Sequence, residues 1–411
     1  MESCGPNIIY TEKGHTEQQQ GDPTAFLKEK LRRYRVKKDP GLPNFQGGWF
    51  GFFSYEYARH FETIEVKESD LKIPEACFYL IDEFVILDPE AQSMTIVVAA
   101  PHQGQAESHY QESCARIAKL RQQITSYREP ETQRLSPSEA GEIASNYQPA
   151  VYQEKVRTIK EYIRAGDIFQ ANFSQRLQTQ CSLTPSELYR RLQKINPSPY
   201  GGLFLHPDFA LVSSSPERLI RLAENQVDTR PIAGTRPRGA DADADERLGQ
   251  ELILNEKERA EHIMLVDLER NDIGRVCKYG SVHVNELMVL EKYSHVIHIV
   301  SNVRGELLDD QDGFDLIKAT FPGGTITGTP KIRCMEILHE MENVARGPYT
   351  GSLGYLSYTG DLDLNIIIRT IILKDGTAYL QVGGGIVADS NPQAEFQETY
   401  YKAQAMLEAL L

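Results

Sequence analysis

The chain mixes short apolar, strand-like runs with longer helical stretches, and no regular β-α-β repeat joins them. Parallel strands need such crossover connections, so this order favours the α+β class with a mainly antiparallel sheet system. The strand-like runs of the second half are Gly202–Leu205, Ala210–Ser214, Leu219–Leu222, Gly351–Tyr358, Leu364–Leu373 and Ala378–Val382. The helical stretches cover residues 246–266, 312–319, 330–342 and 392–410.

A segment rich in Pro, Glu, Ser and Gln at residues 128–149 is typical of a linker. It predicts an N-terminal region over residues 1–127 and a larger domain over residues 150–411. The first 45 residues are polar and are expected to be irregular, apart from one helix near residues 23–36. The sequence GGWFGFFSY at Gly47–Tyr55 predicts a buried strand that another backbone approaches closely.

Composition and charge exclude several classes of protein. The 411 residues are 40% hydrophobic and 25% charged, as in ordinary globular proteins, and no apolar run of 18 residues predicts a membrane span. The formal net charge of -14 argues against a nucleic-acid partner bound through its phosphates. Six scattered cysteines form no Cys-x-x-Cys pair, so a zinc site is not expected. The N-terminus has no secretory signal pattern, so we expect a cytoplasmic protein with reduced thiols.

Two Glu-x-x-Glu segments lie far apart in the chain, at Glu258–Glu261 and Glu395–Glu398. In a helix, residues three apart share a face, so each segment can present two carboxylates in one direction. Four converging carboxylates would suit Mg2+, which binds oxygen ligands and keeps waters that a substrate can replace. For either segment alone, the simpler interpretation is a solvated helix face.

Three glycine-rich segments add possible ligand sites, two of them suited to an anion. The loop Phe321–Lys331 leads into a helix, and its free N–H groups could bind an anion, although a tight structural turn is the simpler alternative. Pro231–Gly239 is a second anion-friendly turn, with two arginines. Gln381–Ile386 contains three successive glycines, where only backbone can approach a ligand.

Two polar residues stand within apolar runs. Arg369 lies inside the apolar run Ile366–Ile371, and a buried arginine needs a carboxylate partner, either a ligand or an internal salt bridge. His295 and His298 would face opposite sides of a strand, so at most one points into a site. A lone histidine in a core is usually structural, but histidine is the first candidate for a general acid near neutral pH.

Together these segments resemble the chorismate-utilising enzymes, a family that includes anthranilate, aminodeoxychorismate, isochorismate and salicylate synthases. The resemblance runs from about Tyr152 to Ala409. It is weaker over residues 47–100, and the N-terminus looks shortened relative to the family, with Glu2 and Ser3 as the remnant of a longer motif. The motifs that carry it are Ile159–Ser174, Ser215–Arg218, Pro231–Thr235, Arg259–His262, Val266–Asp272 and Gly385–Ser390.

The resemblance implies a large, mainly antiparallel β-sandwich core flanked by helices, and a Mg2+-dependent enzyme acting on chorismate. Glu261 and Glu398 would hold the metal, with Glu258 and Glu395 assisting. The implied substrate-binding residues are Ala233, Gly234, Thr235, Tyr349, Arg369, Gly384 and Gly385. The implied catalytic residues are Glu217, His298, Thr325 and Lys402. Of these, His298 would be the acid near the departing C4 hydroxyl.

The branch of the family is harder to assign. The loop at Phe321–Gly328, the segment Gly47–Tyr55 and the sequence DLDLN at Asp361–Asn365 resemble aminodeoxychorismate synthase component I, which aminates chorismate for p-aminobenzoate and folate synthesis. Many members of that branch carry a nucleophilic lysine where Ala233 stands, so anthranilate synthase component I remains the alternative. Isochorismate or salicylate synthase is a lower alternative.

The resemblance also implies partners. No Gly-x-Cys-x-Gly elbow occurs, so the chain would use free ammonia or ammonia from a separate glutaminase subunit. Asn196–Tyr200 resembles part of a tryptophan pocket, so tryptophan is a possible ligand. No nucleic acid and no membrane are expected as partners. A non-catalytic subunit that keeps the fold is a further alternative.

Overall fold

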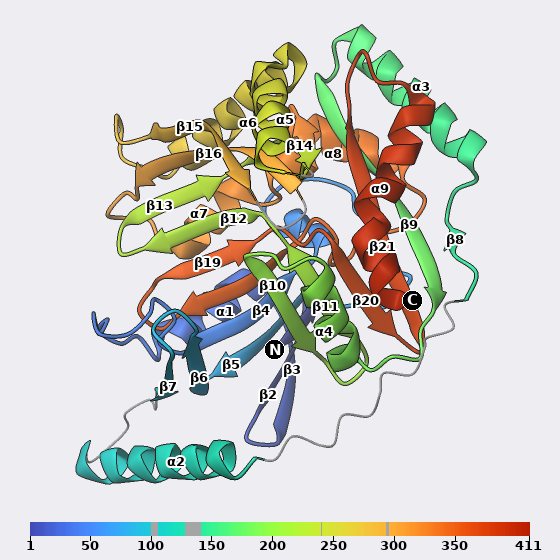
Figure 1. Ribbon diagram of the computed structural model, residues 1–411. Helices are drawn as coiled ribbons and strands as arrows, with labels where there is room; N and C mark the ends of the chain where they lie inside the picture. The colour runs from blue at the N-terminus through green and yellow to red at the C-terminus, as the bar shows by residue number, and fades with distance from the viewer. Residues whose placement is uncertain (100–105, 128–140, 240, 293–295) are drawn as a thin grey trace.

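A computed structural model describes residues 1–99, 106–127, 141–239, 241–292 and 296–411. Two antiparallel sheets face each other, and helices cover their outer faces (Figure 1). This arrangement confirms the predicted α+β class and the β-sandwich flanked by helices. In the described part of the chain, every pairing between two of the named strands is antiparallel.

The larger sheet has twelve strands and combines both halves of the chain. Strand β4 pairs with β18, so the N-terminal region and the C-terminal part share one sheet. The strands in spatial order are β14 (Ile232–Pro237), β16 (Val296–Glu306), β13 (Gln226–Arg230), β12 (Arg218–Ala223), β19 (Leu362–Asn365), β18 (Ser352–Ser357), β4 (Gly48–Phe53), β5 (Ala76–Ile81), β1 (Glu2–Cys4), β2 (Asn7–Glu12) and β3 (His15–Gln20), with β15 (His283–Lys292) beside β16.

The smaller sheet has seven strands, and a separate hairpin forms a third, two-stranded sheet. The seven strands in spatial order are β10 (Tyr200–Leu205), β11 (Ala210–Ser215), β20 (Thr370–Lys374), β21 (Thr377–Ile386), β9 (Gln170–Gln180) and β17 (Gly328–Thr329), with β8 (Ala144–Ser145) beside β9. The hairpin strands are β6 (Glu83–Asp88) and β7 (Ser93–Val98).

Eleven helical segments accompany the sheets in the described residues. The α-helices are α1 (Pro23–Arg32), α2 (Ala106–Ser126), α3 (Pro149–Ala165), α4 (Pro185–Ile195), α5 (Ala242–Leu254), α6 (Glu256–Gly274), α7 (Gly313–Thr320), α8 (Lys331–Met341) and α9 (Pro392–Leu410). Two short 3-10 helices are η1 (Tyr55–His60) and η2 (Gly324–Ile326).

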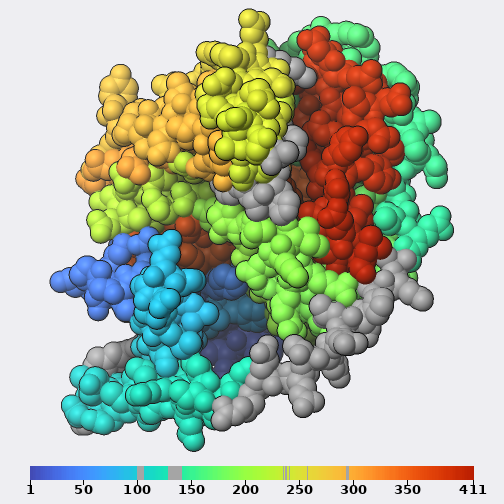
Figure 2. Space-filling view, viewed as in Figure 1, coloured from blue at the N-terminus to red at the C-terminus, as the bar shows by residue number. Residues whose placement is uncertain are grey.

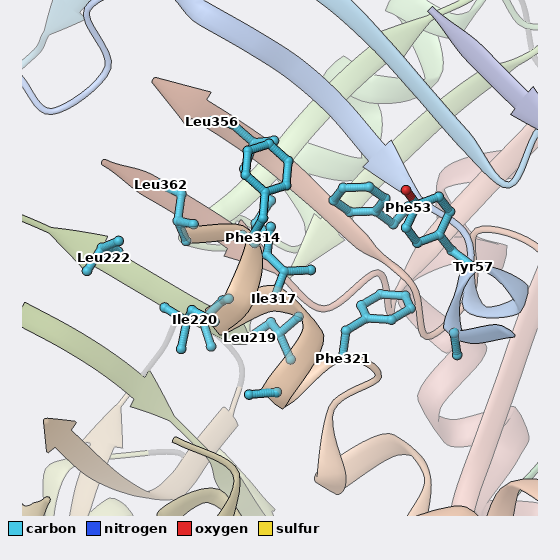
Figure 3. Close-up of a cluster of buried hydrophobic side chains, with 14 of the residues drawn as sticks. Phe53, Tyr57, Leu219, Ile220, Leu222, Phe314, Ile317, Phe321, Leu356 and Leu362 are labelled. Atoms are coloured by element: carbon cyan, nitrogen blue, oxygen red, sulfur yellow. The ribbon is translucent and has the colours of Figure 1, made fainter. Parts of the chain in front are cut away.

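Separate apolar layers hold these elements together. Between the sheets, Phe52 and Leu353 of the large sheet pack with Phe204 and Ile372 of the small one. A larger cluster lies between the twelve-stranded sheet and its helices, and Figure 3 shows its labelled side chains converging from sheet strands, η1, α7 and the residue that follows α7. Those side chains are Phe53, Tyr57, Leu219, Ile220, Leu222, Phe314, Ile317, Phe321, Leu356 and Leu362. Burial of this apolar surface is the main force that fixes the helices on the sheet.

Several predictions about local structure are confirmed. The run Gly47–Tyr55 contains the buried strand β4. A side chain at Gly51 would meet the Cys77 carbonyl oxygen at 2.0 Å, so close backbone approach explains that glycine. The predicted helix near residues 392–410 is α9.

Two predictions about local structure are wrong. Residues 2–20 are not irregular but form β1, β2 and β3 at one edge of the large sheet. Every residue of β3 is exposed, so its sequence carries no apolar alternation that could have revealed it. The predicted strand Leu364–Leu373 is interrupted between β19 and β20, and Arg369 lies at that break with a φ angle of 49°.

The predicted linker stays partly untested, because residues 128–140 lie outside the described residues. Its last part is ordered into the fold, since Ala144 and Ser145 pair with β9. The described residues contain no helix that is long and apolar enough to cross a membrane.

Candidate active site

The predicted site residues gather in two groups, one on the large sheet and one on the small sheet. The first group surrounds β14 and the start of β12. The second group surrounds the end of β21 and the start of α9. Figure 2 shows α5 and α6 in yellow and α9 in red on the same face of the molecule, with the surface recessed between them.

Gly234 is the centre of the first group. A bulge in the pairing of β14 with β16 occurs between Ala233 and Thr235, and Gly234 adopts a φ angle of 64°, which favours glycine. A side chain placed at Gly234 would meet the Glu258 carboxylate at 2.9 Å. The Gly234 carbonyl lies 3.2 Å from Nδ1 of His298. The bulge therefore brings predicted metal-binding, substrate-binding and catalytic residues together.

His298 is a buried residue of β16. Burial and the positive charge of Arg369 lower its pKa to about 4, so the imidazole is neutral at pH 7. Because a carbonyl oxygen can only accept a hydrogen bond, Nδ1–H of His298 donates to the Gly234 carbonyl. A neutral histidine is a weak proton donor, so this environment argues against the predicted role of His298 as the acid.

Glu217 is buried where β12 begins. Burial raises the pKa of Glu217 to about 8, and the negative charge of Glu269 adds to the rise. This pKa is lowered in part by the Thr325 hydroxyl, the Ile232 backbone N–H and the positive charge of Arg369. The carboxyl of Glu217 is therefore mostly protonated at neutral pH and can donate a proton.

Arg369 is half-buried beside Glu217. Burial lowers the pKa of Arg369, and the charge of Glu217 opposes that effect. Arg369 makes no ion pair with any carboxylate among the described residues, so the alternative of an internal salt bridge does not hold there. A partly buried guanidinium without a carboxylate partner is an unfavourable arrangement that an anionic ligand would relieve.

The second group lies where β21 passes α9 and Tyr349. The hydroxyl of buried Tyr349 would be 2.8 Å from a side chain placed at Gly383, so it lies against the glycine-rich strand. A side chain at Gly384 would approach Glu395 at 3.4 Å and Glu398 at 3.5 Å. At Gly385 it would meet Nε2 of Gln170 at 2.3 Å. Because these three residues are glycines, the backbone of β21 lies next to the Glu395 and Glu398 carboxylates.

Lys402 belongs to this second group. Its Nζ lies 2.8 Å from Glu398 Oε1 and donates to the Gly383 carbonyl at 3.0 Å. One helical turn separates Glu398 and Lys402 on α9, which places both on one face.

The four predicted metal ligands lie on the expected helices, but they remain in two pairs. Glu258 is ion-paired with Arg236 at 3.3 Å, and Glu398 with Lys402. Glu261 is half-buried and Glu395 is buried. Among the residues that the structure describes, no group of three or more His, Cys, Asp or Glu side chains is placed to hold a metal. Their hard oxygen donors suit Mg2+, but the metal stays a prediction.

Arg346 links the two groups and was missed by the sequence analysis. Its guanidinium is buried, pairs with Glu342 at 2.8 Å, and donates to the carbonyls of Ile326 at 2.9 Å and Asn172 at 2.6 Å. Ile326 follows Thr325 in the first group, and Arg346 packs against the Tyr349 ring of the second. An arginine directly before Gly347, three residues from Tyr349, was a signal comparable to that of Arg369.

Comparison with known proteins now places the chain. A family model described as chorismate binding enzyme matches residues 5–408. The chain belongs to the chorismate binding enzyme family. It is 44% identical over 393 residues to aminodeoxychorismate synthase component 1 of Bacillus subtilis, covering 95% of this chain and 83% of that protein. It is also 44% identical over 409 residues to anthranilate synthase component 1 of Acetivibrio thermocellus, covering 98% of this chain and 83% of that protein.

A solved structure supports the same family assignment. The crystal structure of anthranilate synthase component I from Streptococcus pneumoniae superposes on the chain with a TM-score of 0.86 and 34% identity, covering 98% of this chain and 91% of that one. The predicted resemblance to chorismate-utilising enzymes is confirmed. Equal identity to two kinds of chorismate binding enzyme leaves the specific reaction open.

Proposed function

We propose that this chain is an aminodeoxychorismate synthase component I, converting chorismate and ammonia to 4-amino-4-deoxychorismate and water. The observation that carries the proposal is a protonated buried acid, Glu217, beside a partly buried cation, Arg369, that has no carboxylate partner among the described residues. Such a pair can bind an anionic substrate and protonate its leaving group.

The first step of the proposal is binding of chorismate, which carries two carboxylates. A protein with a net charge of -14 repels an anion, so binding needs a local positive group. Arg369 supplies it, and the Tyr349 hydroxyl together with the backbone of Gly384 and Gly385 would complete the site for the enolpyruvyl carboxylate. Thr325 and the Ala233–Thr235 bulge would contact the ring.

The second step is loss of the C4 hydroxyl. Glu217 donates its proton to that oxygen, so the C–O bond breaks with water as the leaving group. Ammonia forms the new C–N bond, and the resulting ammonium group loses a proton. Neutral His298 holds the Gly234 carbonyl through its Nδ1–H, which orients the bulge next to the ring. This assignment replaces His298 by Glu217 as the proton donor.

Mg2+ is proposed as the cofactor, held by Glu261 and Glu398 with Glu258 and Glu395 assisting. When bound, it would supply Lewis-acid polarisation and balance the charge of a substrate carboxylate. Arg236 and Lys402 neutralise Glu258 and Glu398 in the described arrangement, so metal binding requires both ion pairs to be exchanged. The carboxylates would then act as metal ligands rather than as salt-bridge partners.

Sequence features support the aminodeoxychorismate branch, and one residue favours the alternative. The segments Phe321–Gly328, Gly47–Tyr55 and Asp361–Asn365 resemble that branch. Ala233 has no nucleophile, so ammonia must attack the ring directly, without a covalent lysine intermediate. Ala233 is the specific observation that keeps anthranilate synthase component I, which also releases pyruvate, as the second candidate.

The partner proposal follows from the same chemistry. The chain has no cysteine elbow, and the names of its relatives describe them as component 1, which supports a separate glutaminase subunit as the ammonia source. Tryptophan binding stays a prediction from Asn196–Tyr200. In that segment, Nδ2 of Asn196 donates to the Ser214 hydroxyl at 3.0 Å.

Product analysis tests the proposed function. Purified protein is incubated with chorismate, Mg2+ and ammonium at alkaline pH, and the products are separated by chromatography. We expect 4-amino-4-deoxychorismate, which gives p-aminobenzoate only after a separate lyase is added. Fluorescent anthranilate with an equal amount of pyruvate would instead establish the second candidate. The same incubation without ammonium is the control.

A further inference from the structure

A second buried carboxyl, that of Glu269 on α6, lies behind the loop that carries Thr325. Glu269 is 3% exposed, and its Oε2 accepts a hydrogen bond of 2.9 Å from the Thr229 hydroxyl of β13. A buried acid needs hydrogen-bond partners to compensate for lost hydration, and here a neutral hydroxyl supplies one. Neither the metal nor the substrate site proposed above uses this residue.

The α6 helix packs directly against the backbone of this loop. A side chain placed at Gly324 would lie 2.3 Å from Leu268 and 3.6 Å from Glu269 Oε1. Real Cβ atoms essentially never come within 3.0 Å of another non-bonded atom, so any other residue at position 324 would force Leu268 to shift. Glu269 and Leu268 therefore fix the position of Gly324, and Thr325 is the next residue.

Glu217 lies beside the next residue of the same loop, Thr325. Its buried carboxyl accepts a hydrogen bond of 3.4 Å from the Ile232 N–H, and the Thr325 hydroxyl faces it. The chain thus places two buried carboxyl groups around Gly324 and Thr325. The negative charge of one acts on the other through an interior that screens it poorly.

We propose that Glu269 is a positioning residue, which holds Gly324 so that Thr325 faces Glu217 and whose charge adjusts how readily Glu217 gives up its proton. The proposal rests on the proposed function, because proton donation by Glu217 is the step that it adjusts. Glu269 itself does not touch the substrate.

The charged groups around Glu269 come from several elements. Asp272 follows one helical turn later on α6, and Lys331 of α8 donates to Asp272 at 2.6 Å and to the Thr320 carbonyl at 2.9 Å. Burial and the charge of Asp272 raise the pKa of Glu269 to about 7, whereas Lys331, the Thr229 hydroxyl and the Gly324 N–H lower it. Arg369 in turn faces Glu217.

These surroundings give the sign of the effect. Ionised Glu269 raises the pKa of Glu217, which keeps Glu217 protonated to a higher pH. Replacing Glu269 by a neutral residue removes that repulsion, so Glu217 loses its proton at a lower pH. Activity that needs protonated Glu217 then disappears earlier as pH rises.

The decisive variant is Glu269→Gln, which keeps the shape of the side chain and an oxygen that can accept from Thr229. We expect the alkaline limb of the pH profile of kcat/KM to move to lower pH by about half a unit to one unit. The KM for chorismate at pH 7 should stay within about twofold of the wild-type value. An unchanged alkaline limb would overturn the proposal.

Asp267→Asn is the matched control. Asp267 is an exposed carboxylate of the same helix, and it pairs only with Arg270 at 2.9 Å in the described chain. It should leave the alkaline limb where it is. A shift equal to that of Glu269→Gln would also overturn the proposal, because any carboxylate on α6 would then have the same effect.

A second measurement separates failure of this proposal from failure of the proposed function. The side-chain carboxyl carbon of Glu217 is followed by 13C NMR over pH in glutamate-labelled protein, with its signal assigned by its loss in Glu217→Gln. This titration needs no catalysis. We expect its midpoint to fall in Glu269→Gln and to stay in Asp267→Asn. An unchanged midpoint in Glu269→Gln refutes the coupling even in a protein that does not turn over chorismate.

Discussion

Replacing Arg369 should affect stability and substrate binding in opposite directions. In the free protein its guanidinium is partly buried without a carboxylate partner among the described residues, so it contributes a desolvation cost and little attraction. We therefore expect Arg369→Met to leave the free energy of unfolding unchanged, or to raise it by about 1 kcal/mol. The positive φ angle of 49° is shared by both side chains and cancels in the comparison.

The effect on binding should be large. Losing the buried partner of a substrate carboxylate costs about 2 to 5 kcal/mol, which corresponds to an increase in KM of about 30-fold to several thousand-fold. Steady-state kinetics over chorismate concentration measures KM, and urea denaturation measures the free energy of unfolding. A loss of stability above about 2 kcal/mol with an unchanged KM would refute the argument and make Arg369 a structural residue.

Arg346→Met is the contrasting variant for this experiment. Arg346 is buried with its carboxylate partner Glu342 at 2.8 Å, so its loss leaves an unpaired buried charge. Removing one partner of such a pair costs about 3 to 5 kcal/mol of stability. The free energies of unfolding of the two variants therefore distinguish an arginine that binds a ligand from one that stabilises the fold.

Three further predictions address the acid, the bulge and the metal. Glu217→Gln should lower kcat by about 100-fold to 10,000-fold with little change in KM. Wild-type kcat/KM should fall as pH rises through about 8, because Glu217 must be protonated to act as the acid. Stopped assays over about two pH units on either side of that pKa measure both effects. Gly234→Ala should lower the free energy of unfolding by about 1 to 2 kcal/mol in denaturant titrations, because the φ angle is positive and the added Cβ would lie 2.9 Å from Glu258. Gly202→Ala should be nearly neutral, because the added Cβ there would have its nearest atom at 4.0 Å. Glu398→Ala should abolish activity that depends on added Mg2+ and weaken Mg2+ binding in calorimetry; full Mg2+-dependent activity would remove this residue from the metal site.

The predictable parts of the fold are those with strong local patterns. Helix α3 has Tyr152, Val156 and Ile159 on its buried face, and Gly166 ends it in the left-handed conformation. Strand β4 is apolar and bounded by glycine. Such patterns act over a few residues, so the sequence shows them directly.

The unpredicted parts depend on contacts between distant segments. Strand β3 is polar and fully exposed, and it is held by pairing with β2 rather than by an apolar face. Arg369 follows three isoleucines in a mostly apolar run, so hydrophobic periodicity could not reveal the break between β19 and β20. Both features follow from which strands become neighbours, which local propensity does not determine.

The site shows the same division. Its glycines, carboxylates and Arg369 stood out by composition, and the structure brings most of them into two groups. The environment of each group could not be predicted, because burial and neighbouring charges set the pKa values of Glu217 and His298. Glu269 was missed as a functional residue, although its spacing of three and four residues from Val266 and Leu265 places it on the buried face of α6.

The most direct test of the central claim is a crystal structure of the Glu217→Gln variant with chorismate and Mg2+. The variant should bind substrate but turn it over slowly, because it lacks the proton donor. We predict a substrate carboxylate in contact with the Arg369 guanidinium and the C4 hydroxyl within hydrogen-bonding distance of residue 217. Chorismate bound with Arg369 and residue 217 both out of contact would contradict the account.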